Sequence, residues 1–229
     1  MIKTIKVMAM ALALLSVVAL SAQAQTVLTF EGLQDQEQVL NFYNGGLGGN
    51  GSGPGTNYGI TFGADSLALI SGANGGSGNF SGSPSMPTVL FFLSGPGDVM
   101  DVSGGFTTGF SFFYSAVNAP GSVDVYSGLD GTGTLLASLS LPTTPSEPGT
   151  TGCPYGPYCP WFPIGVTFSG TAESVVFSGS ANQIGFDDVT LGSPTPGVTP
   201  EPGTMLLFSA GLLALGSALR RRKDAATVA

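Results

Sequence analysis

Apolar residues follow two different patterns along this chain of 229 residues. Near the ends, two continuous apolar runs extend from Val7 to Leu20 and from Gly203 to Leu219. Between them, short runs rich in Val, Phe, Thr and Tyr alternate with Gly, Pro, Asn and Ser, and none keeps a period of 3.6 residues. Short apolar runs bounded by turn-forming residues are typical of β-strands. The sequence therefore predicts an all-β middle region between two apolar ends.

About a dozen short strands with frequent turns predict an antiparallel sandwich of two sheets, similar to a jelly roll. No helix is expected before Met205. Two glycine-rich stretches, 45–55 and 71–78, are interpreted as flexible surface loops, because a phosphate-binding loop needs a lysine and a following helix. The expected strands are Thr26–Phe30, Val39–Tyr43, Gly59–Phe62, Leu67–Ile70, Thr88–Leu93, Val99–Val102, Gly109–Ser115, Ser122–Ser127, Leu135–Leu141, Ile164–Ser169, Ser174–Ser178 and Ile184–Leu191.

The charged residues are segregated along the chain. All six basic residues lie in the terminal segments and the chain has no histidine, so residues 25–199 carry no cationic side chain. Only Glu201 and Asp224 of the fourteen acidic residues lie outside that stretch. A region with a charge of about −12 and no cation repels phosphate backbones, which excludes nucleic acid as a partner. Catalytic sites built on histidine, lysine or arginine are excluded as well.

Composition does not forbid catalysis by two carboxylates, as in glycosidases. The glutamates of the middle region are Glu31, Glu37, Glu147 and Glu173, and nothing in their spacing singles out a pair. Asp130 and the glycine after it lie between two expected strands, and we interpret them as a turn rather than a calcium-binding loop. The chain is therefore expected to be non-enzymatic, with a carboxylate-pair glycosidase as a remote alternative.

Residues 1–24 have the organisation of a signal peptide. Lys3 and Lys6 precede the first apolar run, and Ala22, Gln23 and Ala24 after it form the small-x-small pattern that signal peptidase recognises. Cleavage after Ala24 is expected. The alternative, an uncleaved anchor, would need a run long enough to cross about 30 Å of hydrocarbon, and this run is short for that.

The other end predicts a membrane anchor. Residues 193–202 form a proline-rich linker after a β-sandwich domain at 25–192, and residues 203–219 would make a transmembrane helix about 25 Å long at 1.5 Å per residue. A basic tail, 220–229, follows, and its charge holds it in the cytoplasm, which leaves the domain on the periplasmic side of the inner membrane. The stop-transfer residues are Arg220, Arg221, Arg222 and Lys223.

Val198, Pro200, Glu201 and Pro202, followed by the apolar span and the arginine cluster, resemble the PEP-CTERM sorting signal of Gram-negative bacteria. The resemblance implies an exosortase that cleaves near the Pro-Glu-Pro motif, and a destination at the cell surface or outside the cell in bacteria that make exopolysaccharide. It favours a structural or adhesive role in the envelope. The alternative is an ordinary C-terminal anchor behind a proline-rich linker.

A second candidate function comes from the segment around the two cysteines. Cys153 and Cys159 are the only cysteines in an exported region, which predicts a disulfide between them. Aromatic rings held by this cross-link and by neighbouring prolines would offer a rigid platform for sugar rings, as in a carbohydrate-binding module for exopolysaccharide. The alternative is that the rings plug one end of the sandwich. The rings are Tyr155, Tyr158, Trp161 and Phe162.

A third candidate feature is a structural calcium site, and no other cofactor is required. Glu31 closes the first expected strand, and Asp187 and Asp188 lie in the last, where an adjacent pair should point to opposite faces. Without basic residues, buried carboxylates need backbone N–H groups, hydroxyls, water or a metal ion. The pairing resembles the structural calcium site of jelly-roll carbohydrate-binding modules, which implies these three residues as ligands.

Overall fold

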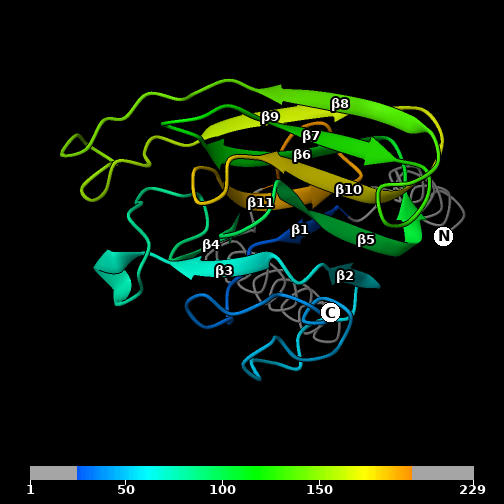
Figure 1. Ribbon diagram of the computed structural model, residues 1–229, viewed down its shortest axis with the longest axis horizontal. Helices are drawn as coiled ribbons and strands as arrows, with labels where there is room; N and C mark the ends of the chain where they lie inside the picture. The colour runs from blue at the N-terminus through cyan, green and yellow to red at the C-terminus, as the bar shows by residue number, and fades with distance from the viewer. Residues whose placement is uncertain (1–24, 198–229) are drawn as a thin grey trace, which may run out of the picture.

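The computed structural model describes residues 25–197, which form an antiparallel sandwich of two β-sheets (Figure 1). In one sheet the strand order is β3-β4-β11-β6-β9, and β1 also pairs with β11. The other sheet has the order β2-β5-β10-β7-β8. Figure 1 shows β8 and β9 along one side of the sandwich and β2 and β3 along the other. Apart from the pairs β3–β4 and β7–β8, neighbouring strands in the two sheets are not consecutive in sequence.

The strands of the first sheet are β1 (Thr26–Leu28), β3 (Ser66–Ile70), β4 (Thr88–Phe92), β6 (Gly109–Ser115), β9 (Phe162–Thr167) and β11 (Gly185–Leu191). Those of the second are β2 (Ile60–Phe62), β5 (Gly97–Phe106), β7 (Gly121–Tyr126), β8 (Leu135–Leu141) and β10 (Ala172–Gly179). Every strand pair is antiparallel.

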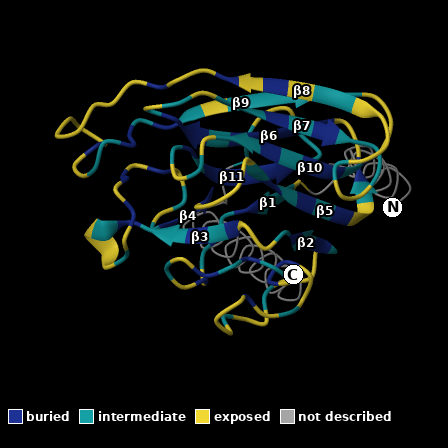
Figure 2. Ribbon diagram, viewed as in Figure 1, coloured by how far each residue is buried: buried dark blue, intermediate teal, exposed yellow. Residues whose placement is uncertain are grey.

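The core between the sheets is filled by aromatic and aliphatic side chains at every second strand position. On β6, Phe110, Phe112 and Tyr114 are buried in this core, and Phe112 and Phe177 of the opposite sheet meet edge to face. Figure 2 shows the exposed residues concentrated in the loops. Burial on this scale explains why the strands were recognisable from their apolar pattern.

The outer face of the first sheet carries a second, smaller hydrophobic cluster. Because successive strand residues point to opposite faces, Val89 on β4 and Phe113 on β6 face away from the main core. Loops 78–87 and 150–161 cover them with Phe80, Tyr158 and Trp161. This sheet is therefore buried on both faces over part of its area.

Eleven of the expected strands are present, but the strand expected at Val39–Tyr43 is wrong. That segment forms turns, in which Phe42 and Tyr43 are buried, and Leu40 has a left-handed backbone (φ 44°). Between residues 25 and 197 there is also one short 3₁₀ helix, η1 (Gly72–Asn74), within the second glycine-rich stretch. The turn expected at Asp130 is confirmed, with left-handed backbone at Asp130 and Gly131.

The glycine-rich stretch 45–55 folds around a buried carboxylate. Glu37 accepts hydrogen bonds from the backbone N–H groups of Gln34, Asn50 and Ser52 at 2.7, 2.8 and 3.0 Å. Burial alone would raise the pKa of Glu37, but these donors outweigh it and hold the pKa below its ordinary value. The loop is therefore tied to the domain rather than free, and Glu37 is committed to holding it.

The two ends of the described chain lie against the sandwich. Residues 193–197, the start of the expected linker, are hydrogen-bonded to it, for instance from the Ser111 hydroxyl to the carbonyl oxygen of Ser193 at 2.9 Å. None of the helical structure in residues 25–197 has the length and apolarity of a membrane span. The expected signal peptide, Pro-Glu-Pro motif, transmembrane helix and basic tail lie outside the described residues.

Candidate functional site

Three acidic residues meet where two strands share one edge of β11. β4 pairs with β11 at Phe186, and β1 pairs with it from Val189 to Leu191, so the start of β4 and the end of β1 lie near each other. Glu31 follows β1, and Asp187 and Asp188 lie on β11 at the junction. The fold thus brings together the three residues that the sequence nominated as calcium ligands.

A bulge makes both aspartates reach the same partner. The register of β11 against β6 shifts between Asp187 and Thr190, and Asp188 has a left-handed backbone (φ 48°). The Ser85 backbone N–H donates to Asp187 Oδ2 at 2.8 Å, and the Ser85 hydroxyl donates to Asp188 Oδ1. The expectation that the adjacent pair points to opposite faces is therefore wrong, because the bulge breaks the alternation.

Glu31 reaches the same loop from the other side. Its Oε1 accepts a hydrogen bond from the Thr88 backbone N–H at 2.8 Å. Thus Ser85 and Thr88, at the two ends of a four-residue segment, bind all three carboxylates. Sequence reasoning missed both partners, because nothing in a run of Ser, Pro and Met marks it as the segment that contacts β11 at Asp187 and Asp188.

Burial raises the free energy needed to ionise these carboxyl groups. Asp187 and Asp188 are fully buried, and burial followed by repulsion from Asp188 raises the pKa of Asp187 well above its ordinary value. Burial also raises the pKa of Asp188 and of Glu31, and for Glu31 the nearby Asp188 adds repulsion. With no basic residue between positions 25 and 197, protons or a bound cation must offset this negative charge.

One oxygen in this cluster has no protein partner. Asp188 Oδ2 is buried and accepts no hydrogen bond from the described residues. An oxygen-only donor set with an orphaned buried oxygen fits the chemistry of Ca²⁺. In residues 25–197, however, no three His, Cys, Asp or Glu side chains are arranged around one point as a metal site requires. Carboxylates alone therefore do not complete a ligand shell here.

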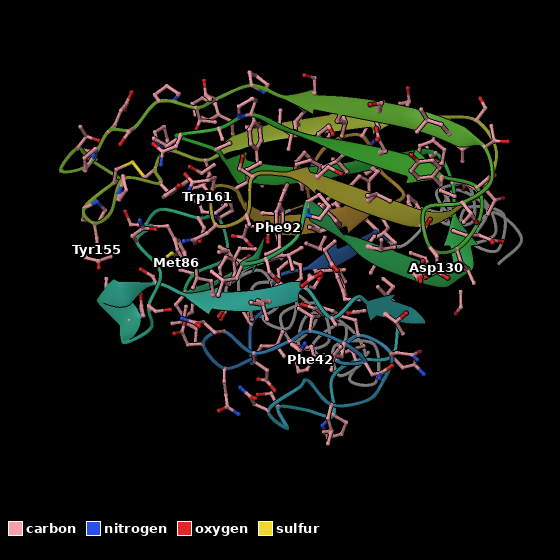
Figure 3. All side chains as sticks on the ribbon, viewed as in Figure 1. Phe42, Met86, Phe92, Asp130, Tyr155 and Trp161 are labelled. Atoms are coloured by element: carbon pink, nitrogen blue, oxygen red, sulfur yellow. A yellow bond between two sulfur atoms is a disulfide. The ribbon has the colours of Figure 1, made fainter. Side chains whose placement is uncertain are left out.

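The disulfide between Cys153 and Cys159 is confirmed. The four rings around it do not form the common exposed platform that their spacing suggested. Tyr155 is 43% exposed, whereas Tyr158 and Trp161 are only 8% and 9% exposed, and Phe162 is half-buried. In Figure 3 Tyr155 lies at one end of the molecule, beyond Trp161. The alternative interpretation, rings that cover one region of the sandwich, describes Tyr158 and Trp161 better.

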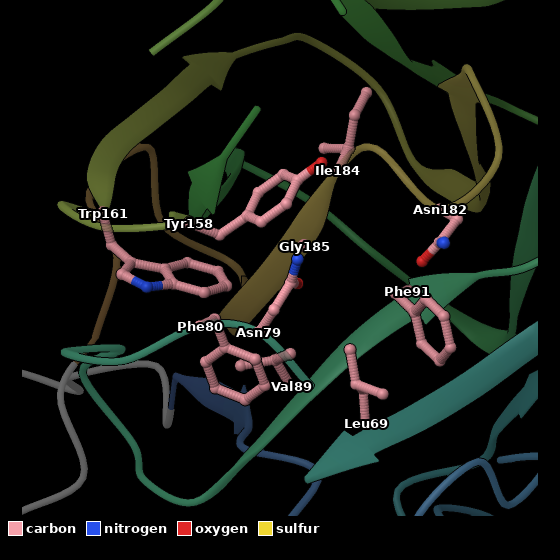
Figure 4. Close-up of a pocket in the computed structure, with 10 residues that line it drawn as sticks. All are labelled: Leu69, Asn79, Phe80, Val89, Phe91, Tyr158, Trp161, Asn182, Ile184 and Gly185. Carbon is pink, nitrogen blue, oxygen red and sulfur yellow. The ribbon is translucent and has the colours of Figure 1, made fainter. Parts of the chain in front are cut away.

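Trp161 is buried because the sheet leaves room for its indole. A Cβ on Gly185 of β11 would lie only 2.7 Å from the indole Cη2, so a larger residue there would collide with the ring. The indole Nε1–H donates to the carbonyl oxygen of Ser81 at 3.0 Å, and Phe80 packs against the ring edge to face. Figure 4 shows Trp161 and Phe80 on one side of Gly185, with Asn182 and Phe91 on the other.

The small cavity between these side chains has a volume of about 20 Å³. A volume of this size holds about one water molecule and has no room for a sugar ring. Its lining is mostly apolar, but Asn79, Asn182 and Tyr158 also border a wider polar groove next to it. Of the aromatic cluster, Tyr158 borders both spaces, whereas Phe80 and Trp161 line only the small cavity.

A comparison with protein families identifies the C-terminal end of the chain. Residues 198–223 match the PEP-CTERM protein-sorting motif. This motif indicates an exported protein whose precursor passes through a membrane, and it implies processing by an exosortase. The PEP-CTERM motif begins directly after the last described residue of the sandwich. A comparison with curated proteins finds no match.

Solved structures with a similar fold include several carbohydrate-binding modules. The module CBM6cm-2 from Cellvibrio mixtus lichenase 5A, in complex with cellotriose, is 12% identical over 57% of this chain and 88% of that chain, with a TM-score of 0.34. The C-terminal CBM6 of LamC from Zobellia galactanivorans is 13% identical over 56% and 99%, with a TM-score of 0.30.

A catalytic protein is also among the similar structures. The family 43 arabinoxylan arabinofuranohydrolase from Bacillus subtilis, in complex with cellotetraose, is 17% identical over 50% of this chain and 24% of that chain, with a TM-score of 0.33. Likenesses this low assign neither a ligand nor a site to this chain.

Proposed function

We propose that this chain is a non-enzymatic protein of the bacterial cell envelope or extracellular matrix, with a structural or adhesive role. The observation that carries the proposal is the PEP-CTERM match at residues 198–223, directly after a β-sandwich that occupies residues 25–197. Consecutive strands from β4 to β7 alternate between the sheets, which supports a jelly-roll-like topology for this exported domain.

The route to the envelope follows from the order of the terminal segments. Signal peptidase removes residues 1–24, and residues 203–219 then hold the precursor in the inner membrane with the basic tail in the cytoplasm. The sandwich lies on the periplasmic side. Exosortase cuts near Pro202, and the processed protein passes to the cell surface or the medium.

The chemistry of the described carboxylates supports a non-enzymatic role. Glu37 is used to hold a loop, and Glu31 accepts a hydrogen bond from the Thr88 backbone. The other two glutamates considered for a catalytic pair lie on separate elements, Glu147 in the connection between β8 and β9 and Glu173 on β10. A glycosidase needs one carboxyl group that ionises and one that stays protonated, both open to substrate.

We propose Ca²⁺ as a structural ion for the junction of β1, β4 and β11. Glu31, Asp187 and Asp188 would hold it after side-chain movements that bring their oxygens around one point, and Asp188 Oδ2 is the buried oxygen that gains a partner. The ion would neutralise the cluster and join the two ends of the domain. The remaining ligands would be backbone or hydroxyl oxygens, which Ca²⁺ accepts readily.

The sorting proposal is tested by changing the motif in a host that makes exosortase. We expect a triple variant, Pro200→Ala with Glu201→Ala and Pro202→Ala, to stay in the inner-membrane fraction at full length, while the unchanged chain is processed. The matched control is Pro194→Ala with Pro196→Ala, two prolines that precede the motif. Equal processing of the triple variant and the unchanged chain would contradict the proposal.

A further inference from the structure

A polar groove lies beside the aromatic cluster, lined by segments that are far apart in sequence. The connections β6–β7 and β10–β11 contribute Asn118 and Gln183, and the disulfide loop contributes Tyr158. Its volume is about 350 Å³, within the range of small-molecule sites. Five of its lining side chains are amides: Gln36, Asn79, Asn118, Asn182 and Gln183.

Three hydrogen bonds fix the orientation of two of these amides. Asn118 Nδ2 donates to Gln183 Oε1 at 2.9 Å and to the Tyr158 hydroxyl at 3.1 Å, and that hydroxyl donates to Gln183 Oε1 at 3.0 Å. These bonds use the amide nitrogen of Asn118 and the amide oxygen of Gln183. The acceptor Asn118 Oδ1 and the donor Gln183 Nε2 make no further hydrogen bond within residues 25–197.

The groove thus presents a neighbouring acceptor and donor in fixed positions. A hydroxyl group both donates and accepts, so two adjacent hydroxyls of one molecule can satisfy both groups at once. Asn79 and Asn182, which also line the groove, add two more amide groups to this capacity. Because the first pair is already held by Tyr158, little side-chain entropy is lost when a ligand binds.

The rest of the lining selects against charged ligands. No charged residue lines the groove, and the described chain offers no cation to attract an anionic polymer. A region with a charge of about −12 repels such polymers at long range. Leu69, Leu93 and Pro157 supply apolar surface between the amides. Hydroxyl-rich molecules with apolar C–H faces, which are neutral sugars, match this mixture.

We infer that this groove binds a segment of a neutral polysaccharide, with Asn118 and Gln183 hydrogen-bonded to adjacent sugar hydroxyls. The inference rests on the proposed function, because export brings the domain to the side of the envelope where such polymers lie. It moves the sugar-binding role from the rings of the disulfide loop to the amides beside them. Tyr158 keeps a part in it as a positioning residue.

The test is native gel electrophoresis of the full chain through gels that contain one polysaccharide each. The neutral probes are hydroxyethylcellulose, xylan, galactomannan and laminarin, and alginate is the anionic comparison. The detergent must lack a sugar headgroup, since that would compete. At least one neutral probe should retard the protein, and Asn118→Ala with Gln183→Ala should weaken its affinity by tenfold or more, while alginate has no effect.

Three further variants separate the groove from its surroundings. Tyr158→Phe keeps the ring but removes the hydroxyl, and should weaken binding severalfold. Tyr155→Ala tests the exposed ring and should leave binding unchanged. Asn74→Ala removes an exposed amide of the nearby helix η1 that does not line the groove, and should also bind normally. Thermal melts verify that each variant is folded.

The inference is overturned if no neutral probe retards the protein, or if the double variant is retarded as strongly as the unchanged chain. Loss of binding in Tyr155→Ala alone would also overturn it, because the platform would then be the exposed ring. These outcomes are independent of sorting, since the gels use purified protein and sorting is read from the C-terminus of protein made in cells.

Discussion

The buried carboxyl group of Asp98 links the stability of this domain to pH. It is 8% exposed, and its Oδ2 has no hydrogen-bond partner within the described chain. Burial, with repulsion from Asp65 and Asp101, raises the pKa of Asp98 from 3.8 to about 7. The folded protein therefore keeps this carboxyl group protonated over a range in which the unfolded chain ionises it.

The consequence is a loss of stability as pH rises. The contribution of Asp98 is complete below pH 3.8, declines as pH increases through the interval up to about 7, and is absent above it. A shift of this size corresponds to about 4 kcal/mol of unfolding free energy. In Asp98→Asn, the free energy of unfolding measured with urea should fall less between pH 4 and 7.

The matched control for this measurement is Asp124→Asn, a half-buried aspartate on β7 of the same sheet. This variant should keep the pH dependence of the unchanged chain, because the other buried carboxylates remain. The same slope in Asp98→Asn and in the unchanged chain would show that Asp98 is ionised in the folded protein.

At the level of elements, the disulfide loop and the sheet beneath it depend on one ring. Trp161 is buried over Gly185 and hydrogen-bonded to Ser81, so Trp161→Ala removes both packing and a satisfied N–H. We expect it to lower the free energy of unfolding by about 3–5 kcal/mol. Tyr155→Ala, which removes an exposed ring of the same loop, should change the free energy of unfolding by less than about 1 kcal/mol.

Urea unfolding followed by tyrosine fluorescence measures the free energy of unfolding of both variants. Similar losses in the two variants would mean that Trp161 is not buried in solution.

The junction of β1, β4 and β11 carries the calcium prediction. A bound ion stabilises only the folded form, so EDTA should lower the melting temperature by several degrees and excess Ca²⁺ should restore it. Asp188→Asn should not respond to either reagent, whereas Asp124→Asn should respond normally. If EDTA and Ca²⁺ leave the melting temperature of the unchanged chain the same, the cluster is neutralised by protons instead.

The sequence predicted strands well where the ends of an apolar run are clearly marked. β6 and β8 were predicted with their observed bounds, because turn-forming residues flank apolar runs on both sides. Val39–Tyr43 was misread, since an apolar run buried by turns has the same composition as a short strand. The bulge at Asp188 could not be predicted from the sequence either. A single left-handed residue inside a strand does not alter the pattern of apolar and polar residues from which strands are recognised.

At the level of the whole molecule, the sequence pointed to candidate binding sites only where acidic or aromatic residues were conspicuous. The acidic trio was found because its members close the first strand and begin the last, which the sandwich brings together. The amide groove was missed, because each of its side chains is an ordinary loop residue and only the tertiary fold places them together. Conversely, the conspicuous aromatic loop proved to be mainly a cover for one sheet.

The proposed export and sorting of this protein depend most on how its C-terminus is processed. The PEP-CTERM match places a processing signal after the sandwich, so the mature protein should lack the apolar span and the basic tail. Mass spectrometry of the protein recovered from cells that contain exosortase measures this directly. We predict a C-terminus near Pro202 and no peptide from residues 203–229; recovery of protein that still ends at Ala229 would contradict the account.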